Sequence, residues 1–445
     1  MGLVDRLKAK PKESLYHLRV EDGDYRGLRL HLRLEKDGSG VLVINASRVV
    51  FLNKTATEIV HDFIKGENED HTLKRLLRRY KVDTETARKD IRKTLFVVNS
   101  LAKTPDVCPV SYLNVEKIEP FQRELSAPYR MDLALTYRCN NRCIHCYAGG
   151  PRQTGELTTE EWLQVIDKLR ALGIPQVVFT GGEPTLRDDL ATLIAYTQKT
   201  GLVSGLVTNG RKLKDKAYLQ SLIDAGLDHV QITVESHDPK VHDRITGTSG
   251  SWRETIRGLK NALASPIYTV SNTTLSQYNV DDVEATIEFL NGLGVKQFAC
   301  NSLIYSGKAP EVAESFALEE ARLEPVLNRI KDKAGRLGIE FTWYTPTEYC
   351  EVSPLQLELG IKSCSACRIN MAIEPDGTVI PCQSYSIAPL GNILKDSWKK
   401  IWQNPICLKL RERKYAPDKC YQCPSLNICG AGCPLKTNTR VSAHA

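Results

Sequence analysis

The feature that most constrains the fold is a regular alternation of short apolar segments with amphipathic stretches through the middle of the chain. The apolar segments have strand length, and the intervening stretches have helical periodicity. The expected strands are 131–136, 176–180, 202–208, 230–234, 267–273 and 297–300, and the expected helices lie near 159–172, 188–200, 215–225, 252–264 and 281–292. Alternation of this kind is typical of a parallel sheet in an α/β protein. Six units predict a partial (β/α)6 barrel rather than a complete eight-unit barrel.

The first 105 residues show a different pattern and predict a small separate α+β domain of winged-helix-like type. Leucine alternates with arginine or histidine over 28–35, which has the period of a half-buried strand and gives one apolar and one basic face. Shorter strands are expected at 41–44 and 49–52. The first expected helix begins near Thr55 and is ended by Gly66. Two further helices are expected over 71–80 and 84–101, and Asp83 is the expected N-cap of the last.

The remaining boundaries follow from composition. Residues 106–127 hold prolines and little periodicity, which predicts a linker, and the barrel is assigned to 128–340 with a last helix near 318–337. The segment 341–445 is loop-rich and contains nine of the chain's 14 cysteines. We therefore expect a cysteine-rich C-terminal domain there.

Charge and hydropathy exclude several classes of protein. No apolar run reaches the roughly 18 residues of a membrane span, and the N-terminus has no apolar signal region, so we expect a cytoplasmic protein without membrane contact. The net charge is +7, spread along the chain. Its densest basic run, 74–79, is interpreted as a solvated helix face, with an acidic peptide partner as the alternative. The sequence has no basic stripe with interleaved aromatic residues, so we do not expect nucleic-acid binding.

The cysteines indicate metal binding. A disulfide scaffold is expected in a short secreted chain, whereas clustered cysteines in a long cytosolic one favour a metal site. Cys139, Cys143 and Cys146 form a CxxxCxxC motif directly after the first barrel strand, where parallel α/β folds place their chemistry. Three thiolates can hold three irons of a 4Fe–4S cluster and leave the fourth open. The alternative is zinc with His145 as its fourth ligand.

This strand, the cysteine motif and the aromatic Tyr147 after it resemble the radical SAM (S-adenosylmethionine) superfamily over about residues 128–310. Gly181, Gly182 and Glu183 follow the second strand as the family's GGE motif does, with the glycines permitting close backbone approach and Glu183 accepting from the SAM amino group. The resemblance extends to further SAM-binding positions at the ends of later strands. Thr233 and Glu235 end the fourth strand, and Thr233 is expected to bind the SAM carboxylate together with Arg244, eleven residues further on. The alternative for Arg244 is a surface ion pair. Asn209 ends the third strand and either faces SAM or caps the turn.

The resemblance implies the chemistry of the superfamily. The open iron chelates SAM, an external flavodoxin- or ferredoxin-type donor reduces the cluster, and cleavage of the S–C5′ bond yields a 5′-deoxyadenosyl radical. This radical abstracts hydrogen from an unactivated C–H bond, so the enzyme is an oxidoreductase in which the protein supplies positioning and water exclusion. No catalytic acid or base beyond the cluster is assigned.

The C-terminal cysteines fall into two sets. Cys367-x9-Gly377-x4-Cys382 is followed by Cys420-x2-Cys423-x5-Cys429-x3-Cys433. Such arrays also occur in zinc ribbons, but the combined spacing resembles the SPASM domain, which carries auxiliary iron–sulfur clusters.

The resemblance implies a ligand set for each of two auxiliary clusters. The first is expected to use Cys364, Cys367, Cys382 and Cys433, and the second Cys420, Cys423 and Cys429. No cysteine follows Cys433 in this sequence, so the second cluster has an open iron, a non-cysteine ligand, a ligand borrowed from Cys350 or Cys407, or is absent. Cys300 is interpreted as a small core residue and Cys108 as a free thiol.

The N-terminal pattern, including 53–59 at the start of the first helix, resembles the PqqD-like peptide-recognition element. A plain winged-helix or capping domain is the alternative. The resemblance implies that the leader of a precursor peptide adds as a strand to the sheet edge, and a basic rim from residues 28–35 would suit an acidic leader.

Three functions follow from these patterns. The first is a radical SAM maturase of ribosomally made, post-translationally modified peptides. The second is a radical SAM/SPASM enzyme that acts on a sulfatase or on a haem-pathway intermediate; Gln383 stands where sulfatase-maturating relatives have an acidic residue, which disfavours the sulfatase. The third is a zinc-binding peptide-recognition scaffold, in which the GGE motif and Thr233 would have no use.

Overall fold

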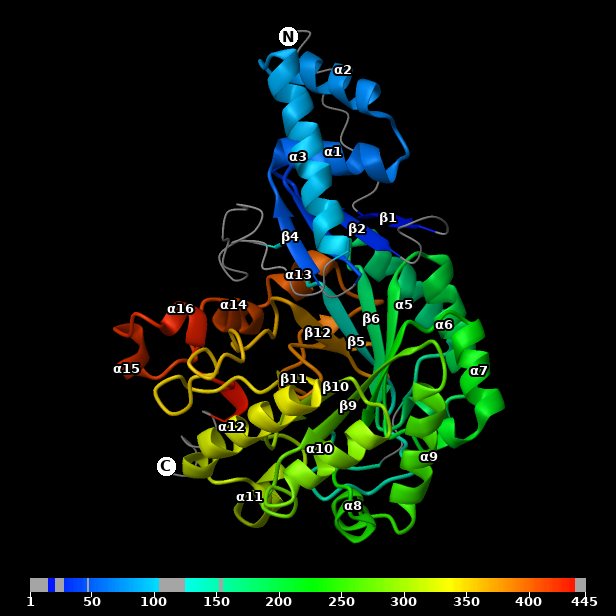
Figure 1. Cartoon of the computed structure of the whole chain (residues 1–445), viewed down its shortest axis with the longest axis vertical. Helices are drawn as coiled ribbons and strands as arrows, with labels where there is room; N and C mark the ends of the chain where they lie inside the picture. Colours follow the sequence, from blue (N-terminus) through cyan, green and yellow to red (C-terminus); the bar gives the residue numbers. More distant parts are fainter. Residues whose placement is uncertain (1–14, 21–27, 46–47, 104–124, 152–154, 437–445) are drawn as a thin grey trace. The chain divides into compact units, whose positions relative to one another are not determined.

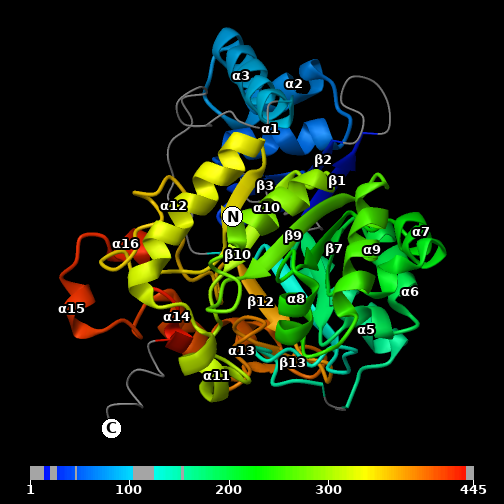
Figure 2. The ribbon, with the colours of Figure 1, turned by 60° about the horizontal axis from the view of Figure 1, so that its bottom comes forward.

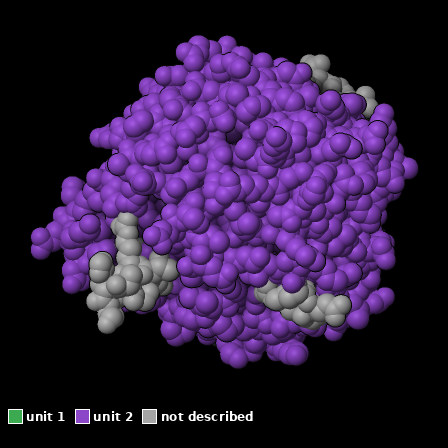
Figure 3. Space-filling view, turned by 90° about the horizontal axis from the view of Figure 1, so that it is seen from below, with its two compact units in different colours: residues 1–129, 166–176 green, residues 130–165, 177–445 purple. Residues whose placement is uncertain are grey.

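A computed structural model describes residues 15–20, 28–45, 48–103, 125–151 and 155–436. By contact density the chain divides into two compact units. Unit 1 comprises residues 1–129 with 166–176, and unit 2, purple in Figure 3, comprises residues 130–165 with 177–445. Among the described residues, no helix combines the length and the apolarity that crossing a bilayer requires.

Unit 1 contains a four-stranded antiparallel sheet and three helices (Figure 1). The strands β1 (Leu15–Arg19), β2 (Arg29–Leu34), β3 (Gly40–Ile44) and β4 (Arg48–Leu52) are hydrogen-bonded in sequence order. The helices are α1 (Lys54–Ile64), α2 (Glu69–Arg79) and α3 (Thr84–Lys103). Three strands and three helices match the predictions, and β1 is an additional strand that the sequence analysis missed.

Local sequence explains the first helix of this unit. The side chain of Asn53 accepts from the backbone N–H of Ala56 at 2.9 Å, which caps α1. Ile59, Val60 and Ile64 are buried on one face of α1, as the 3.6-residue period predicts. The burial of these three side chains fixes α1 against the rest of the unit.

The predicted basic rim of β2 is wrong at its centre, because the side chains of His31 and Arg33 are buried and only Arg29 is partly exposed. His31 and Arg33 are each only 2% exposed. The Arg33 guanidinium donates to the carbonyl oxygens of Ala127 and Pro128 at 3.0 Å, and its Nε lies 2.8 Å from Glu35. A cation buried in this way needs such partners, so Arg33 serves the fold of unit 1 and offers no charge to a leader peptide.

Unit 2 is built on a ten-stranded sheet in the order β11-β10-β9-β8-β7-β6-β5-β12-β13-β14. The seven strands of the partial barrel are β5 (Arg130–Thr136), β6 (Gln176–Gly181), β7 (Val203–Thr208), β8 (His229–Thr233), β9 (Tyr268–Thr274), β10 (Gln297–Asn301) and β11 (Glu340–Trp343). Six of them match the predicted strands. The seventh, β11, pairs in parallel with β10 and was not predicted.

Helices alternate with these strands, as Figures 1 and 2 show for α6, α7 and α9 beside the sheet. Their bounds are α5 (Thr159–Ala171), α6 (Leu190–Lys199), α7 (Lys216–Asp224), α8 (Pro239–Thr246), α9 (Ser251–Leu263), α10 (Val283–Gly292), α11 (Ala309–Phe316) and α12 (Glu320–Leu337), with short 3-10 helices η3 (Pro184–Leu186) and η4 (Lys212–Lys214). The predicted helices are present, and α8 and α11 are additional.

The C-terminal segment continues the barrel sheet. Its strands β12 (Asn370–Ile373), β13 (Thr378–Ile380) and β14 (Gly391–Asn392) follow one another, and β12 pairs in parallel with β5. The short helices α13 (Trp398–Trp402), α14 (Pro405–Arg411), α15 (Asp418–Tyr421) and α16 (Leu426–Cys429) complete the unit. One sheet therefore contains strands of both the predicted barrel (128–340) and the predicted C-terminal domain (341–445). The boundary between these two domains stays a prediction.

One strand pair carries a pH-sensitive group. His229 of β8 lies opposite Gly205 of β7, where a Cβ would overlap the imidazole ring. Burial, with Arg130 as a second cause, lowers the pKa of His229 from 6.5 to about 4. Between these two values the unfolded chain binds a proton that the folded chain does not, so folding free energy is lost as the pH falls from 6.5 toward 4.

We therefore expect His229→Gln to reduce the acid sensitivity of the fold. The wild type should lose about 2 kcal/mol through this residue between pH 7 and pH 5. Denaturant unfolding of both proteins at the two pH values measures the difference. An equal loss of stability in the wild type and the variant would show that the folded protein does not disfavour protonation of His229.

Candidate active site

The cysteine motif lies on a loop directly after β5, and neighbouring backbone holds that loop in place. The N–H groups of Arg142 and Ile144 donate to the carbonyl oxygens of Thr246 and Ile245 at 2.9 and 3.0 Å. The carbonyl of Cys146 accepts from the N–H of Lys308 at 3.1 Å. These bonds use only main-chain atoms of the loop, so they do not depend on the thiol groups.

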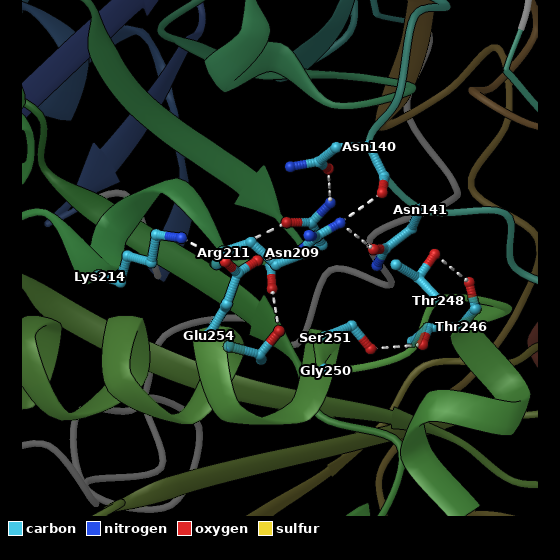
Figure 4. A network of polar contacts seen from close by, with 12 residues as sticks. Asn140, Asn141, Asn209, Arg211, Lys214, Thr246, Thr248, Gly250, Ser251 and Glu254 are labelled. Atoms are coloured by element: carbon cyan, nitrogen blue, oxygen red, sulfur yellow. Dashed lines mark hydrogen bonds and ion pairs between the residues drawn. The ribbon is translucent and has the colours of Figure 1, made fainter.

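A polar network supports the other end of the loop (Figure 4). The Arg211 guanidinium donates to the carbonyl oxygen of Asn140 and, at 3.0 Å, to Oδ1 of Asn141. Asn209 Nδ2 donates to Oδ1 of Asn140 at 2.7 Å. Glu254 orients the Arg211 guanidinium through an ion pair at 2.6 Å. The cysteine loop is thus clamped from the carboxyl end of β7, where Asn209 and Arg211 follow Thr208.

We expect Arg211→Ala to loosen this clamp and to lower SAM cleavage by about 10- to 100-fold, the usual effect of removing a group that orients metal ligands. Lys214→Ala is the matched control, because Lys214 also pairs with Glu254 but does not contact the loop among the interactions described. The rate of 5′-deoxyadenosine formation and the iron content per chain measure both variants. Equal rates in the two variants would contradict a role for Arg211 in holding the loop.

The GGE motif brings the end of β6 against the loop. A Cβ at Gly181, where φ is 134°, would overlap the carbonyl oxygen of Thr136, and one at Gly182 would overlap that of Arg138. The N–H of Gly182 donates to the Thr136 carbonyl at 2.7 Å. Only glycine permits this approach, so the two glycines are required by the junction between β5 and β6.

Glu183, the last residue of the GGE motif, is held by donors of the protein itself. Its carboxylate is fully buried and accepts from the hydroxyl groups of Thr185 and Thr208 at 2.6 and 2.7 Å and from the N–H of Asn209 at 2.9 Å. Burial raises the pKa of Glu183, while the bonds from Thr185 and Asn209 lower it. Both oxygens are engaged by protein donors, so the structure gives Glu183 a part in joining β6 to β7, and its contact with the SAM amino group stays a prediction.

The site opens into one cavity of about 550 Å³, which lies within the usual range for small-molecule sites. Its walls include the carboxyl ends of successive barrel strands, where α/β proteins bind ligands. Of the predicted site residues, it is lined by Cys139, Cys143, Cys146, Tyr147, Gly181, Gly182, Asn209, Thr233 and Glu235. The sequence analysis therefore identified much of one wall.

The three thiols of the loop lie in surroundings that suit metal thiolates rather than free thiolates. Burial raises the pKa of Cys139 to about 11 and that of Cys143 well above its ordinary value. Nearby negative charges, including Glu235 for Cys143 and Cys146 for both, raise these values further. Without a metal these two thiols hold their protons, and a metal that binds them must displace those protons.

Iron–sulfur ligation fits the loop better than zinc. The imidazole Nε2 of His145 lies 3.3 Å from Oε1 of Glu235, and the ring stacks on Phe316 at 4.8 Å. In the described part of the chain, no three His, Cys, Asp or Glu side chains converge on a single-ion site. One zinc ion needs all its thiolates within about 2.3 Å, whereas the thiolates of a 4Fe–4S cluster bind different irons.

The structure places Arg244 outside the cavity, so its contact with the SAM carboxylate stays a prediction. Arg244 is exposed and stacks over the ring of Tyr278 at 4.1 Å, and it does not line the cavity. Its helix, α8, ends at Thr246 and Gly247, beside the cysteine loop. The resemblance assigned Arg244 by its position in the chain, but the sequence analysis did not predict α8, the helix that decides which way Arg244 faces.

The cavity also has polar walls that the sequence analysis missed. Arg130 Nε lies 2.9 Å from Oδ1 of the buried Asp132, and both residues line the cavity. Asn272 of β9 donates from Nδ2 to Oδ1 of Asn301 at 2.9 Å, on the neighbouring strand β10. The signal that could have revealed them is a polar residue within an otherwise apolar barrel strand, such as Asp132 in β5.

Three of the four cysteines predicted for the first auxiliary cluster line this same cavity. They are Cys364, Cys382 and Cys433. Burial is the largest cause that raises the pKa of Cys382, and the charges of Cys364 and Cys433 add to it, because the three sulfurs lie near one another. The loop cysteines and these C-terminal cysteines thus face a common space.

The fourth predicted ligand, Cys367, is not brought to the cavity. It is fully buried and forms a disulfide with Cys407 of α14. Its backbone N–H donates to the carbonyl of Pro381, next to Cys382, at 3.2 Å. Ligation by Cys367 therefore stays a prediction that requires reduction of this disulfide.

Family comparisons agree with the geometry. The family model "Radical SAM superfamily" matches residues 133–290, and the SPASM model, described as an iron–sulfur cluster-binding domain, matches residues 364–424. The PqqA peptide cyclase of Ruegeria pomeroyi is 28% identical over 316 residues, which span 69% of this chain and 82% of that protein. The Fe-coproporphyrin III synthase of Methanosarcina barkeri is 28% identical over 339 residues, which span 70% and 83%.

Solved structures share the fold. SuiB of Streptococcus suis bound to S-adenosylmethionine has a TM-score of 0.67 at 16% identity, with 92% of this chain and 95% of SuiB covered. SuiB bound to its precursor peptide SuiA has the same TM-score at 17% identity and covers 94% and 96%. The protein anSMEcpe with bound AdoMet and a peptide has a TM-score of 0.55 and covers 69% of this chain. The two family models thus give the chain a radical SAM domain at residues 133–290, which carries the cysteine loop, and an iron–sulfur cluster-binding SPASM domain at residues 364–424.

Proposed function

We propose that this enzyme is a maturase that modifies a ribosomally made precursor peptide. The observation that carries the proposal is the extent of the likeness to SuiB, whose structure holds a precursor peptide. A match over 92–94% of this chain must include most of residues 1–105, the part that a peptide maturase would use to hold a leader. The likeness to the PqqA peptide cyclase supports the same function.

The donor set supports the cofactors of this reaction. Cys139, Cys143 and Cys146 would hold the 4Fe–4S cluster, with SAM in the cavity beside Gly181, Gly182 and Thr233. When bound, the reduced cluster and SAM supply the 5′-deoxyadenosyl radical that abstracts hydrogen from the substrate. Reduction would come from a flavodoxin- or ferredoxin-type donor.

The residues of this chain provide the positioning. Asn209 and Arg211 hold the loop that carries the ligands, and the backbone of Gly182 keeps the end of β6 against it. Glu235 accepts from the N–H of Thr274 at 2.9 Å, and its other oxygen lies 3.3 Å from Nε2 of His145, so these contacts fix a carboxylate in the cavity wall.

A second candidate function is a step on an iron porphyrin, which the likeness to the Fe-coproporphyrin III synthase favours. A sulfatase substrate is disfavoured, since Gln383, which lines the cavity, brings no carboxylate there. The two candidate functions differ in their substrate, so they are distinguished by whether the enzyme modifies a peptide or an iron porphyrin.

The test is an anaerobic incubation with SAM, dithionite and each short peptide encoded beside the gene. We expect 5′-deoxyadenosine together with a mass change in one peptide. Iron coproporphyrin III offered in parallel is the control substrate. Its conversion, with every peptide unchanged, would replace the proposal by the second candidate.

A further inference from the structure

The second auxiliary site has three assigned cysteines and an undecided fourth ligand. Cys420 lies in α15, Cys423 follows one turn later with its N–H donating to the Cys420 carbonyl at 3.0 Å, and Cys429 ends α16. The sequence offers two cysteines outside both sets that could complete the site, Cys350 and Cys407. Their positions in the fold decide between them.

The segment that carries Cys350 packs directly on Cys429. The N–H of Tyr349 donates to Sγ of Cys429 at 3.3 Å, and that sulfur lies 3.7 Å from the carbonyl oxygen of Thr347. The N–H groups of Glu351 and Val352 donate to the carbonyl of Glu348 at 2.9 and 3.0 Å, so the chain turns at this point. Cys350 is therefore held within the turn, next to a residue that hydrogen-bonds a ligand sulfur.

Cys350 also lies near a second member of the site. Cys420 interacts electrostatically with both Cys350 and Cys429. Interactions of this kind weaken as the separation grows. Cys350 and Cys423 are both exposed, Cys420 is half-buried and Cys429 is buried, so the four cysteines run from the surface to the interior.

Cys407 is placed elsewhere. It is fully buried in α14 and bonded to Cys367, which the family resemblance assigns to the first cluster. Among the described residues, no hydrogen bond or disulfide joins Cys407 to Cys420, Cys423 or Cys429. The choice between the two cysteines therefore favours Cys350.

We propose that Cys350 is the fourth thiolate ligand of the second auxiliary iron–sulfur cluster, together with Cys420, Cys423 and Cys429. On binding iron, each thiol releases its proton. A cluster with four thiolates has no open iron, so this site would transfer electrons and would not bind substrate. The ligand would also tie the segment after β11 to the C-terminal helices. This inference rests on the iron–sulfur chemistry of the proposed function, but not on a peptide substrate.

The first test counts iron. In a Cys139/Cys143/Cys146 triple-Ala background only the auxiliary clusters remain, so a further Cys350→Ala substitution should lower iron by about one to four atoms per chain. Cys300→Ala is the matched control, since Cys300 is a buried barrel cysteine outside both sets. Unchanged iron, together with an unchanged EPR spectrum of the reduced protein, would overturn the assignment.

The second test follows the thiol itself and needs no variant. Iodoacetamide should alkylate Cys350 and Cys423 in cluster-free protein, because both are exposed. After anaerobic reconstitution both should be protected, as peptide mass mapping would show. Protection of Cys423 with continued alkylation of Cys350 would overturn the ligand assignment. Alkylation of both would overturn the cluster, whereas a failure of the peptide-maturase function alone would leave both protected.

Discussion

Cys143→Ala is expected to abolish SAM cleavage, with 5′-deoxyadenosine falling below about a thousandth of the wild-type rate. A loss of this size corresponds to roughly 4 kcal/mol of transition-state stabilisation. Cys143 is one of three loop thiols that line the cavity, and two ligands cannot hold the cluster with one open iron. Chromatographic quantitation of 5′-deoxyadenosine under reducing conditions measures the effect.

The variant should remain folded and should still bind peptide. The loop is held by main-chain bonds from Arg142 and Ile144 to the end of α8, which do not involve the thiol. Cys300→Ala is the control for loss of a buried cysteine, and it should retain cleavage. Cleavage of SAM by Cys143→Ala at a wild-type rate would show that the radical arises elsewhere in the molecule.

The barrel and the ligand loop were predictable because their signals are local. Strand and helix periods place β5 to β10 in order, and the carboxyl ends of such strands share one edge. The spacing of Cys139, Cys143 and Cys146 therefore located the site. The family likeness then added Gly181, Gly182 and Thr233, all of which line the cavity.

The departures arise where a contact joins distant parts of the sequence. Arg33 was expected on an exposed basic face, because its alternation with leucine is that of a half-buried strand. It is buried by carbonyl groups of residues 127 and 128, about 95 positions away, which no local period can reveal. Arg244 stacks on Tyr278 for a similar reason, since the two residues belong to different barrel units.

The same limit applies to the cysteines. Motif spacing assigned Cys367 to the first cluster, but the choice of partner depends on which helix packs beside it, and α14 brings Cys407 there. Spacing likewise left the fourth ligand of the second cluster open. The placement of Cys350 depends on the turn after β11, which lies about 70 residues before Cys420 in the chain.

Deletion of residues 1–105 is expected to weaken binding of the precursor leader by about 100-fold or more, equivalent to roughly 3 kcal/mol. This part of unit 1 has its own apolar cores, one between the sheet and α1 and α3 and one among the three helices. Its antiparallel sheet ends at β1 and β4, and a strand edge can receive an extended peptide through main-chain hydrogen bonds. Fluorescence anisotropy of a labelled leader measures the affinity.

The truncated enzyme should still cleave SAM without a bound peptide, because the cysteine loop, its clamp at Arg211 and the cavity all lie in unit 2. Full-length Cys143→Ala is the matched control, since it should bind the leader and form no 5′-deoxyadenosine. The pair separates recognition from chemistry: one variant loses binding and the other loses cleavage. A truncated enzyme that binds the leader as tightly as the full chain would place peptide recognition in the barrel or SPASM part and would remove the assigned role of residues 1–105.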